Sequence, residues 1–274
     1  MALSQKENSL SRLSERFDTL KQKGEKALIC FVTAGDPSAE ATADIVAALA
    51  DAGADAVEIG LPYSDPLADG PSIQAASQRS LDGGMSVLKA LEIVRQIRRK
   101  TPDLPLILMT YYNPILRYGL ERYARDAREA GADAHIVTDL TPEESDDWRR
   151  ISQANGLDTI FLLAPTSTAD RIEIVARIAS GFVYCVSRTG VTGARQDVPA
   201  ELAVMINQIK AKTETPVCIG FGISQPEHVQ KIAAISDGAI VGSSLVDLIH
   251  KNRADARLLD AVREYVHALK QATK

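Results

Sequence analysis

One unit recurs along this chain and constrains its fold more than any other feature. It consists of a short apolar run, a turn containing Gly, Pro or Asp, and a stretch with helical periodicity. The apolar runs are 28–32, 56–59, 106–109, 134–137, 159–163, 182–186, 217–219 and 239–241, eight in all. The helical stretches are 39–51, 87–100, 120–130, 142–155, 169–179, 199–212, 226–235, 243–250 and 257–270. Because near-continuous apolar runs are typical of strands covered on both faces, this alternation predicts a parallel sheet.

Eight parallel strands close best as a barrel, so we predict the α/β class and a single (β/α)₈ TIM barrel. The domain is expected to span residues 1–274, with the barrel itself at about 27–270. Two units share the sequence Ala-Gly-Ala-Asp-Ala, at 52–56 and 130–134, which ends a helix and leads directly into a strand. An open doubly wound sheet is the alternative, but no G-x-G-x-x-G motif follows the first strand to support it.

An extra helix is expected before the first strand. Leu10, Leu13, Phe17 and Leu20 recur at helical spacing among charged residues. This pattern predicts a short amphipathic N-terminal helix at about residues 8–22.

Composition and charge exclude several functional classes. The net charge of −5 argues against a nucleic-acid partner, because phosphate binding needs a basic face. No apolar run approaches the ~18 residues of a membrane span, and residues 1–26 have no signal-peptide core, so we expect a cytoplasmic protein without membrane contact. Cys30, Cys185 and Cys218 lie in separate apolar runs and are expected to be buried, reduced thiols. No histidine or cysteine has metal-ligand spacing, so no metal is expected.

The stretch 57–71 brings three carboxylates to the end of one strand. Glu58 interrupts an apolar run that should contain only Val, Ile or Leu in a strand covered on both faces. Glycines and prolines then shape a loop that carries Asp65 and Asp69. Barrel active sites lie at the carboxyl ends of the strands, so this acidic loop is the predicted reaction site.

Glycine-rich loops follow the last three strands, and they predict a phosphate site. Glycine lets backbone N–H groups approach an anion, and a helix N-terminus favours its negative charge. Ser243 is expected to cap the helix that follows the eighth strand. The alternative is that these glycines only make tight turns. The residues are Gly190, Gly193, Gly220, Gly222, Gly242 and Ser243.

Five motifs, in order along the chain, resemble those of the tryptophan synthase α subunit family. They are 31–37, 58–71, 111–114, 187–193 and 220–224, and the stretch Pro-Tyr-Ser-Asp-Pro-Leu-Ala-Asp-Gly-Pro is the most specific. The resemblance implies retro-aldol cleavage of indole-3-glycerol phosphate to indole and glyceraldehyde 3-phosphate. It also implies no cofactor in this chain, and a pyridoxal-phosphate-dependent β subunit that receives the indole for L-tryptophan synthesis in an α2β2 heterotetramer.

The chemistry of this reaction and the resemblance together suggest three catalytic candidates. Glu58 is expected to donate and then accept a proton, with a pKa raised by burial. The resemblance places Asp69 at the indole N–H, where a carboxylate stabilises a positive ring. It also places the Tyr184 hydroxyl near Glu58 or the substrate. The alternatives are a structural ion pair for Glu58, a turn residue for Asp69 and plain packing for Tyr184.

The remaining site residues are expected to bind the substrate. Phe31 and Ile73, with Met109 and Leu163, are candidates for an apolar slot around the indole ring. In segment 187–198, which resembles the family's mobile lid, Thr192 is expected to contact the catalytic region and Gly193 to bind substrate. Gly222, Gly242 and Ser243 are the expected phosphate ligands. Asp65 is expected to brace its loop or face the partner, and Asp139 matches a region that interacts with the lid.

Two positions depart from the family pattern. The family tends to have an apolar residue where His135 stands and Pro where Thr138 stands. A hydrogen bond within the barrel is one role for His135, and a satisfied core histidine is the favoured one.

Three other functions remain open from the sequence. One is a stand-alone indole-releasing lyase, and another is a weakly catalytic activator of the β subunit. The activator does not account for both Glu58 and Asp69. A phosphate-sugar isomerase on the same barrel has no evident use for the 62–71 motif.

Overall fold

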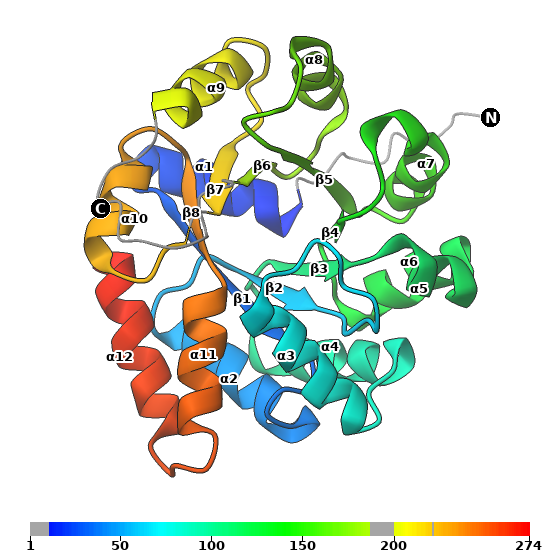
Figure 1. Cartoon of the computed structure of the whole chain (residues 1–274), viewed down its shortest axis with the longest axis vertical. Helices are drawn as coiled ribbons and strands as arrows, with labels where there is room; N and C mark the ends of the chain where they lie inside the picture. Colours follow the sequence, from blue (N-terminus) through cyan, green and yellow to red (C-terminus); the bar gives the residue numbers. More distant parts are fainter. Residues whose placement is uncertain (1–10, 187–199, 221) are drawn as a thin grey trace, which may run out of the picture.

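A computed structural model describes residues 11–186, 200–220 and 222–274, and eight parallel strands form a closed barrel at its centre (Figure 1). Each strand pairs with the next in chain order, and the eighth pairs with the first. The strands are β1 Ala27–Thr33, β2 Ala56–Gly60, β3 Leu106–Thr110, β4 Ala134–Val137, β5 Asp158–Leu163, β6 Val183–Val186, β7 Val217–Gly220 and β8 Gly238–Val241. The predicted (β/α)₈ barrel is confirmed.

The helices surround the barrel (Figure 1). In order they are α2 Ala39–Asp51, α3 Pro71–Asp82, α4 Val87–Lys100, α5 Tyr112–Tyr118, α6 Leu120–Ala130, α7 Asp146–Ala154, α8 Ala169–Ile178, α9 Ala200–Lys210, α10 Pro226–Ala233, α11 Ser243–Asn252 and α12 Leu258–Gln271. Between these helices and the strands lies the larger of the apolar cores, which contains alternate residues of every strand.

Helix α1 (Arg12–Lys23) closes the amino-terminal end of the barrel. Its N-cap is Ser11, whose hydroxyl accepts the backbone N–H of Ser14 at 3.2 Å. Buried Leu13, Phe17 and Leu20 of this helix pack with the side chains that fill the barrel interior. The N-terminal helix is therefore present, although residues 8–10 of its predicted span lie outside the described residues.

The structure explains the repeated Ala-Gly-Ala-Asp-Ala sequence by the contacts of its aspartate. Asp55, directly before β2, accepts the backbone N–H of Leu28 in β1 at 2.8 Å. Asp133, directly before β4, accepts the N–H of Leu106 in β3 at 2.9 Å. Each of these buried carboxylates also pairs with a basic side chain, Lys270 at 2.9 Å for Asp55 and Arg98 at 2.7 Å for Asp133. The repeat thus locks neighbouring strands together at the end opposite the predicted site.

The structure differs from the sequence prediction in two unpredicted helices and in one predicted helix that is interrupted. Helices α3 and α5 lie in segments with no predicted helix, and α3 begins at Pro71, where a missing N–H costs nothing. The predicted helix 142–155 is a 3₁₀ turn, Pro142–Glu144, followed by α7. The break occurs at Ser145, whose hydroxyl donates to the carbonyl of Pro142 at 2.7 Å.

Candidate active site

Glu58 lies inside the barrel near the carboxyl end of β2. Its neighbours Val57 and Ile59 face the surrounding helices, so alternation along the strand turns Glu58 inward. The side chain is 1 % exposed, and its Oε1 has no hydrogen-bond partner among the described residues. Burial raises the pKa of Glu58 to about 8, because a charge is poorly solvated there. No ion pair neutralises it in the described part of the chain, so the structural ion-pair alternative finds no support.

Asp69 lies in the loop between β2 and α3, half-buried at the same end of the barrel. Its backbone N–H donates to the carbonyl of Pro66 at 3.1 Å, and its carbonyl accepts Gln74 Nε2 at 2.8 Å. Burial raises the pKa of Asp69 to about 6, and a hydrogen bond from the Tyr111 hydroxyl partly opposes that rise. At neutral pH Glu58 is therefore largely protonated while Asp69 is largely ionised. Two carboxyl groups at one barrel mouth thus have opposite protonation states.

Tyr184 of β6 points into the barrel towards the two acids. Burial raises the pKa of its hydroxyl well above the ordinary value, and the charges of Glu58 and, more weakly, Asp69 add to the shift. The ring lies over Gly220 of β7: a Cβ atom there would be 2.5 Å from the Tyr184 hydroxyl oxygen. Gly220, expected from the sequence as a phosphate glycine, is therefore needed to make room for Tyr184.

Apolar side chains adjoin the acids. Phe31 packs with Ile73 and Met109 in a separate small cluster. The Phe31 ring covers Gly60, where a Cβ atom would be 2.5 Å from the ring carbon Cζ. The expectation that Leu163 belongs to this slot is wrong, because its side chain faces the surrounding helices. In a strand covered on both faces, both sets of side chains are apolar, and the inward neighbour is Leu162.

The predicted phosphate end lies beside this slot. A Cβ atom on Gly242 would be 3.8 Å from Ile73 Cδ1 and 3.7 Å from Phe31 Cβ. The N-cap of α11 is Gly242, with no side-chain cap, and Ser243 is the first helical residue, so the predicted capping role of Ser243 is wrong. The first N–H groups of α11 are consequently left for another acceptor, as an anion site requires. Gly222 is exposed with φ +41° in the neighbouring loop.

Part of the predicted site lies outside the described residues. This applies to Thr192 and Gly193, and to the other lid residues of segment 187–198. Within the described ranges, no group of three or more His, Cys, Asp or Glu residues is arranged to hold a metal ion. All three cysteines are buried and unpaired, as predicted.

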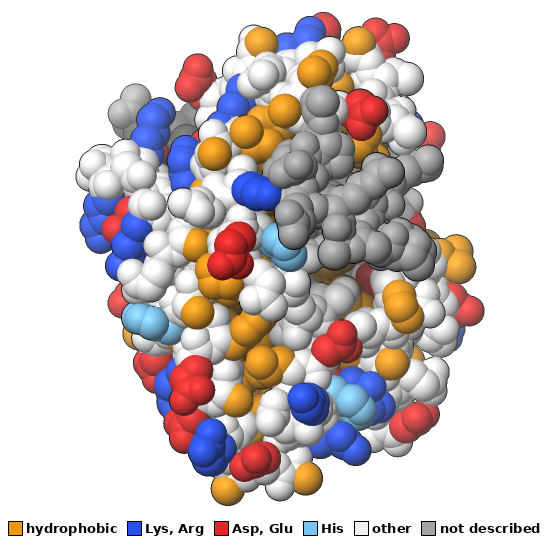
Figure 2. Space-filling model, turned by 60° about the vertical axis from the view of Figure 1, so that its left-hand side comes forward, with side chains coloured by type: hydrophobic (Ala, Val, Ile, Leu, Met, Phe, Trp, Pro, Cys, Tyr) orange, Lys and Arg blue, Asp and Glu red, His pale blue; other side chains and the backbone are white. Residues whose placement is uncertain are grey.

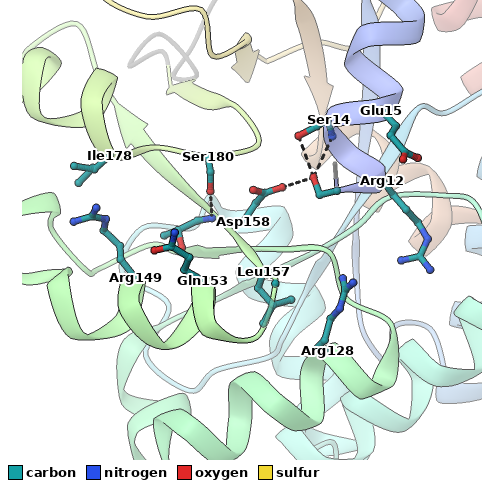
Figure 3. A pocket seen from close by; sticks show the side chains of 13 residues that line it. Arg12, Ser14, Glu15, Arg128, Arg149, Gln153, Leu157, Asp158, Ile178 and Ser180 are labelled. Carbon is teal, nitrogen blue, oxygen red and sulfur yellow. Dashed lines mark hydrogen bonds between the residues drawn. The ribbon is translucent and has the colours of Figure 1, made fainter. Parts of the chain in front are cut away.

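A pocket of 670 Å³ at the opposite end of the barrel is not part of this site (Figure 3). Arg12, Arg128 and Arg149 line it together with Glu15 and Asp158. Arg12 pairs with the buried Asp133 at 2.8 Å, and Arg149 pairs with Asp146 at 3.0 Å. Because each of the three arginines already pairs with an aspartate, Arg128 with Asp133 at 3.7 Å, the pocket has the character of a structural ion-pair region. On the face drawn in Figure 2, basic and acidic side chains are likewise interspersed.

Comparisons with known proteins identify the family of this chain. The model of the family described as tryptophan synthase alpha chain matches residues 17–274. This chain belongs to that family. The tryptophan synthase alpha chain of Geobacter sp. strain M21 is 49 % identical over 262 residues, covering 96 % of this chain and 97 % of the relative. That of Solibacter usitatus is 47 % identical, covering 96 % and 98 %.

Solved structures give the same answer for the fold. The tryptophan synthase subunit alpha of Legionella pneumophila strain Paris superposes with a TM-score of 0.90 at 37 % identity, covering 97 % of this chain and 99 % of that one. Tryptophan synthase of Mycobacterium tuberculosis superposes with a TM-score of 0.88 at 36 % identity, with the same coverage. As an alpha chain of tryptophan synthase, the protein cleaves indole-3-glycerol phosphate, a lyase reaction. The family's alpha subunit has no cofactor of its own; pyridoxal phosphate belongs to the β subunit with which it works.

The two departures from the family pattern lie in different places. His135 is fully buried on the outer side of β4, with its ring centroid 5.2 Å from that of Tyr123 and 5.3 Å from that of Trp148. The expectations of a hydrogen bond within the barrel and of a satisfied core histidine are both wrong, since neither ring nitrogen has a partner among the described residues. Burial lowers the pKa of His135 to about 3. Thr138, in contrast, follows β4 at the end of the barrel that holds the acids.

Tyr111 is a further residue of the site, not predicted from the sequence. Its hydroxyl oxygen accepts the backbone N–H of Ala68 at 2.9 Å, next to Asp69. The residue lies in the motif 111–114 that marks the family, and that was its only signal, because a hydrogen bond across 43 positions of sequence leaves no local pattern. Asp65 is exposed and accepts the Ser64 hydroxyl at 2.6 Å, a contact that braces the loop.

Proposed function

We propose that Glu58 is the proton donor and acceptor of the indole-3-glycerol phosphate cleavage, and that Asp69 stabilises the charged intermediate. The observation that carries this proposal is the different surroundings of the two acids at one barrel mouth: Glu58 is fully buried and its Oε1 has no hydrogen-bond partner among the described residues, whereas Asp69 is only half-buried. Glu58, with a pKa of about 8, supplies a proton at neutral pH, whereas Asp69, with a pKa of about 6, supplies a negative charge.

The proton and the electron pair of the cleavage are accounted for with Glu58 and Asp69 alone. Glu58 protonates the indole ring carbon that bears the glycerol chain, and the ring nitrogen becomes positively charged. Asp69 accepts a hydrogen bond from that N–H and stabilises the cation. The Glu58 carboxylate then removes the proton of the adjacent hydroxyl. The carbon–carbon bond breaks, its electrons return to the ring, and indole and glyceraldehyde 3-phosphate leave with Glu58 protonated again.

The substrate would lie across the barrel mouth. The cluster of Phe31 and Ile73 forms one wall for the indole ring, and Tyr184 faces the acids from the opposite strand. The phosphate would bind the uncapped N-terminus of α11 at Gly242 and Ser243, with Gly222 beside it. Thr192 and Gly193 would complete the site from segment 187–198. The position of Gly242 supports this arrangement: a Cβ atom added there would be 3.8 Å from Ile73 Cδ1, so the phosphate end lies beside the apolar wall.

We propose an α2β2 heterotetramer for the assembly with the β subunit, in the cytoplasm. The loop between β2 and α3 would take part in that contact, since Leu67 at its tip is 93 % exposed beside exposed Asp65. An exposed leucine beside the acidic site suits a protein interface. No helix in the described ranges is long and apolar enough to cross a membrane.

The test is the pH profile of kcat/KM for indole release, measured with and without added tryptophan synthase β subunit. We expect a bell with limbs near pH 6 and pH 8, because the reaction needs ionised Asp69 and protonated Glu58. Glu58→Gln should lose nearly all activity, and the exposed Glu121→Gln, as a matched control, should lose none. Full turnover in Glu58→Gln would remove Glu58 from the mechanism. Fast release without the partner would identify a stand-alone lyase instead.

A further inference from the structure

Tyr111 connects the end of β3 to the acidic loop. The residue is the N-cap of α5 and is 5 % exposed. Its hydroxyl oxygen accepts the Ala68 N–H at 2.9 Å. Burial raises the pKa of the neighbouring Asp69 carboxyl, and the same hydroxyl partly opposes that rise. One phenol therefore fixes the loop backbone next to Asp69 and acts on the Asp69 carboxyl itself.

The Tyr111 ring and the residues next to it are held by further contacts. Its ring packs on Tyr63, with centroids 5.1 Å apart and planes at 35°. Asn113 Nδ2 donates to the Tyr63 hydroxyl at 3.2 Å. The Asp139 carboxylate, from the loop after β4, accepts the N–H of Tyr112 at 2.7 Å. Tyr111 is thus a fixed support rather than a freely rotating side chain.

The acidic loop has few other supports. Other hydrogen bonds of residues 64–69 within the described part of the chain run inside the loop or to Gln74 of the adjoining α3. The bond from Ala68 to Tyr111 is what joins this end of the loop to a barrel strand. An exposed loop without such a bond would leave its carboxylate free to turn towards water.

We infer that Tyr111 is a positioning residue: its hydroxyl holds the Ala68 backbone next to Asp69 and thereby orients the Asp69 carboxylate towards the substrate. Thr138 supports it from the end of β4, where its hydroxyl lies within reach of both the Thr110 carbonyl, at 3.2 Å, and the Tyr111 hydroxyl. This inference rests on the proposed role of Asp69. The pKa of Tyr111 is raised to about 12, so its hydroxyl remains a donor throughout the working pH range.

The test compares Tyr111→Phe with the parent, with saturating β subunit, in pH profiles of kcat and kcat/KM. The variant keeps the ring that packs on Tyr63 and removes only the hydroxyl. We expect kcat/KM at pH 7 to fall about tenfold, and the acid limb to move up by about one pH unit, as for loss of one hydrogen bond to a carboxylate. Tyr118→Phe is the matched control: it removes a 2.7 Å hydrogen bond from a tyrosine to Asp126 outside the site, and should change neither.

The shift of the acid limb separates positioning from plain structural support. A loss of activity that is uniform across pH, with the acid limb unmoved, would overturn the inference. Asp69→Asn, measured alongside, tests the proposed function separately, since full activity in that variant removes Asp69 from the mechanism whatever Tyr111→Phe shows. If Tyr111→Phe fails to fold, Thr138→Val decides: a smaller upward shift of the same limb supports the inference, and an unchanged limb overturns it.

Discussion

Replacing Glu58 by Gln should inactivate the enzyme and, at the same time, make the fold more resistant to unfolding at neutral and alkaline pH. The folded protein holds the pKa of Glu58 at about 8, above the ordinary value of 4.5, because the carboxyl is buried without a partner in the described structure. Since the folded-state pKa is raised, the contribution of protonated Glu58 to the free energy of unfolding is fully present below pH 4.5. That contribution is lost as the pH rises through 8. A glutamine has no such dependence.

The size of the effect follows from these two pKa values. Each pH unit between them costs about 1.4 kcal/mol of the free energy of unfolding, so the parent loses about 1 kcal/mol by pH 5 and about 3 kcal/mol by pH 7. The difference at pH 7 corresponds to roughly 6–12 °C in Tm for a chain of this size. The buried amide of the variant has its own desolvation cost, but that cost does not change with pH.

The assay is therefore the difference in Tm between Glu58→Gln and the parent, measured at half-unit steps from pH 5 to pH 8. We expect the difference to widen steadily with pH in favour of the variant. Glu121→Gln, which alters an exposed carboxylate, should follow the parent throughout. A constant difference from pH 5 to pH 8 would show that Glu58 titrates alike in the folded and unfolded chain, and would refute the argument from burial.

Three further predictions concern packing and buried charge. Gly220→Ala places a Cβ atom 2.5 Å from the Tyr184 hydroxyl. We expect about 1–3 kcal/mol of destabilisation, measured by denaturant titration, and a lower kcat. Unchanged kcat and stability would mean that the Tyr184 ring is not held there. Asp133→Ala removes the carboxylate that pairs with Arg98 and leaves the Leu106 N–H without its acceptor. It should cost about 3–5 kcal/mol, whereas exposed Asp146→Ala should cost little. His135→Leu removes an imidazole whose folded-state pKa is about 3. The unfolded chain takes up a proton on His135 near pH 6.5, so the free energy of unfolding of the parent should fall by about 2 kcal/mol between pH 8 and pH 5. The variant should not show this fall. Equal acid sensitivity of the two proteins would contradict that explanation.

Local patterns were sufficient for the fold, with specific failures. The eight apolar runs predicted all eight strands, because a short apolar run bounded by turn residues and followed by a helical stretch is typical of a strand covered on both faces. Helix α3 was missed because Gly70 and Pro71 indicate a loop, although proline is also well suited to the first turn of a helix. The break before α7 depends on the Ser145 hydroxyl bond, which periodicity does not reveal.

The two candidate acids were predicted from the sequence, but several of the residues around them were not. Glu58 was recognisable because a charge in an apolar run is a local anomaly, and Asp69 because it lies in a specific motif. Leu163 and His135 were assigned to the wrong side or the wrong surroundings, since apolar character on both faces of a strand hides which side chains point inward. Gly220 was taken for a phosphate glycine, whereas the Tyr184 ring on the neighbouring strand accounts for it.

By itself, the sequence determined the number and order of the strands, and it pointed to the end of the barrel where the candidate site lies and to the two acids proposed for it. These are properties of short segments, set by side-chain type and spacing. Only the tertiary structure decided the opposite protonation of Glu58 and Asp69, the support that Tyr111 gives to the acidic loop, and the uncapped start of α11 beside Ile73. The physical reason is that desolvation and hydrogen bonding depend on neighbours far apart in the chain, which barrel closure alone brings together.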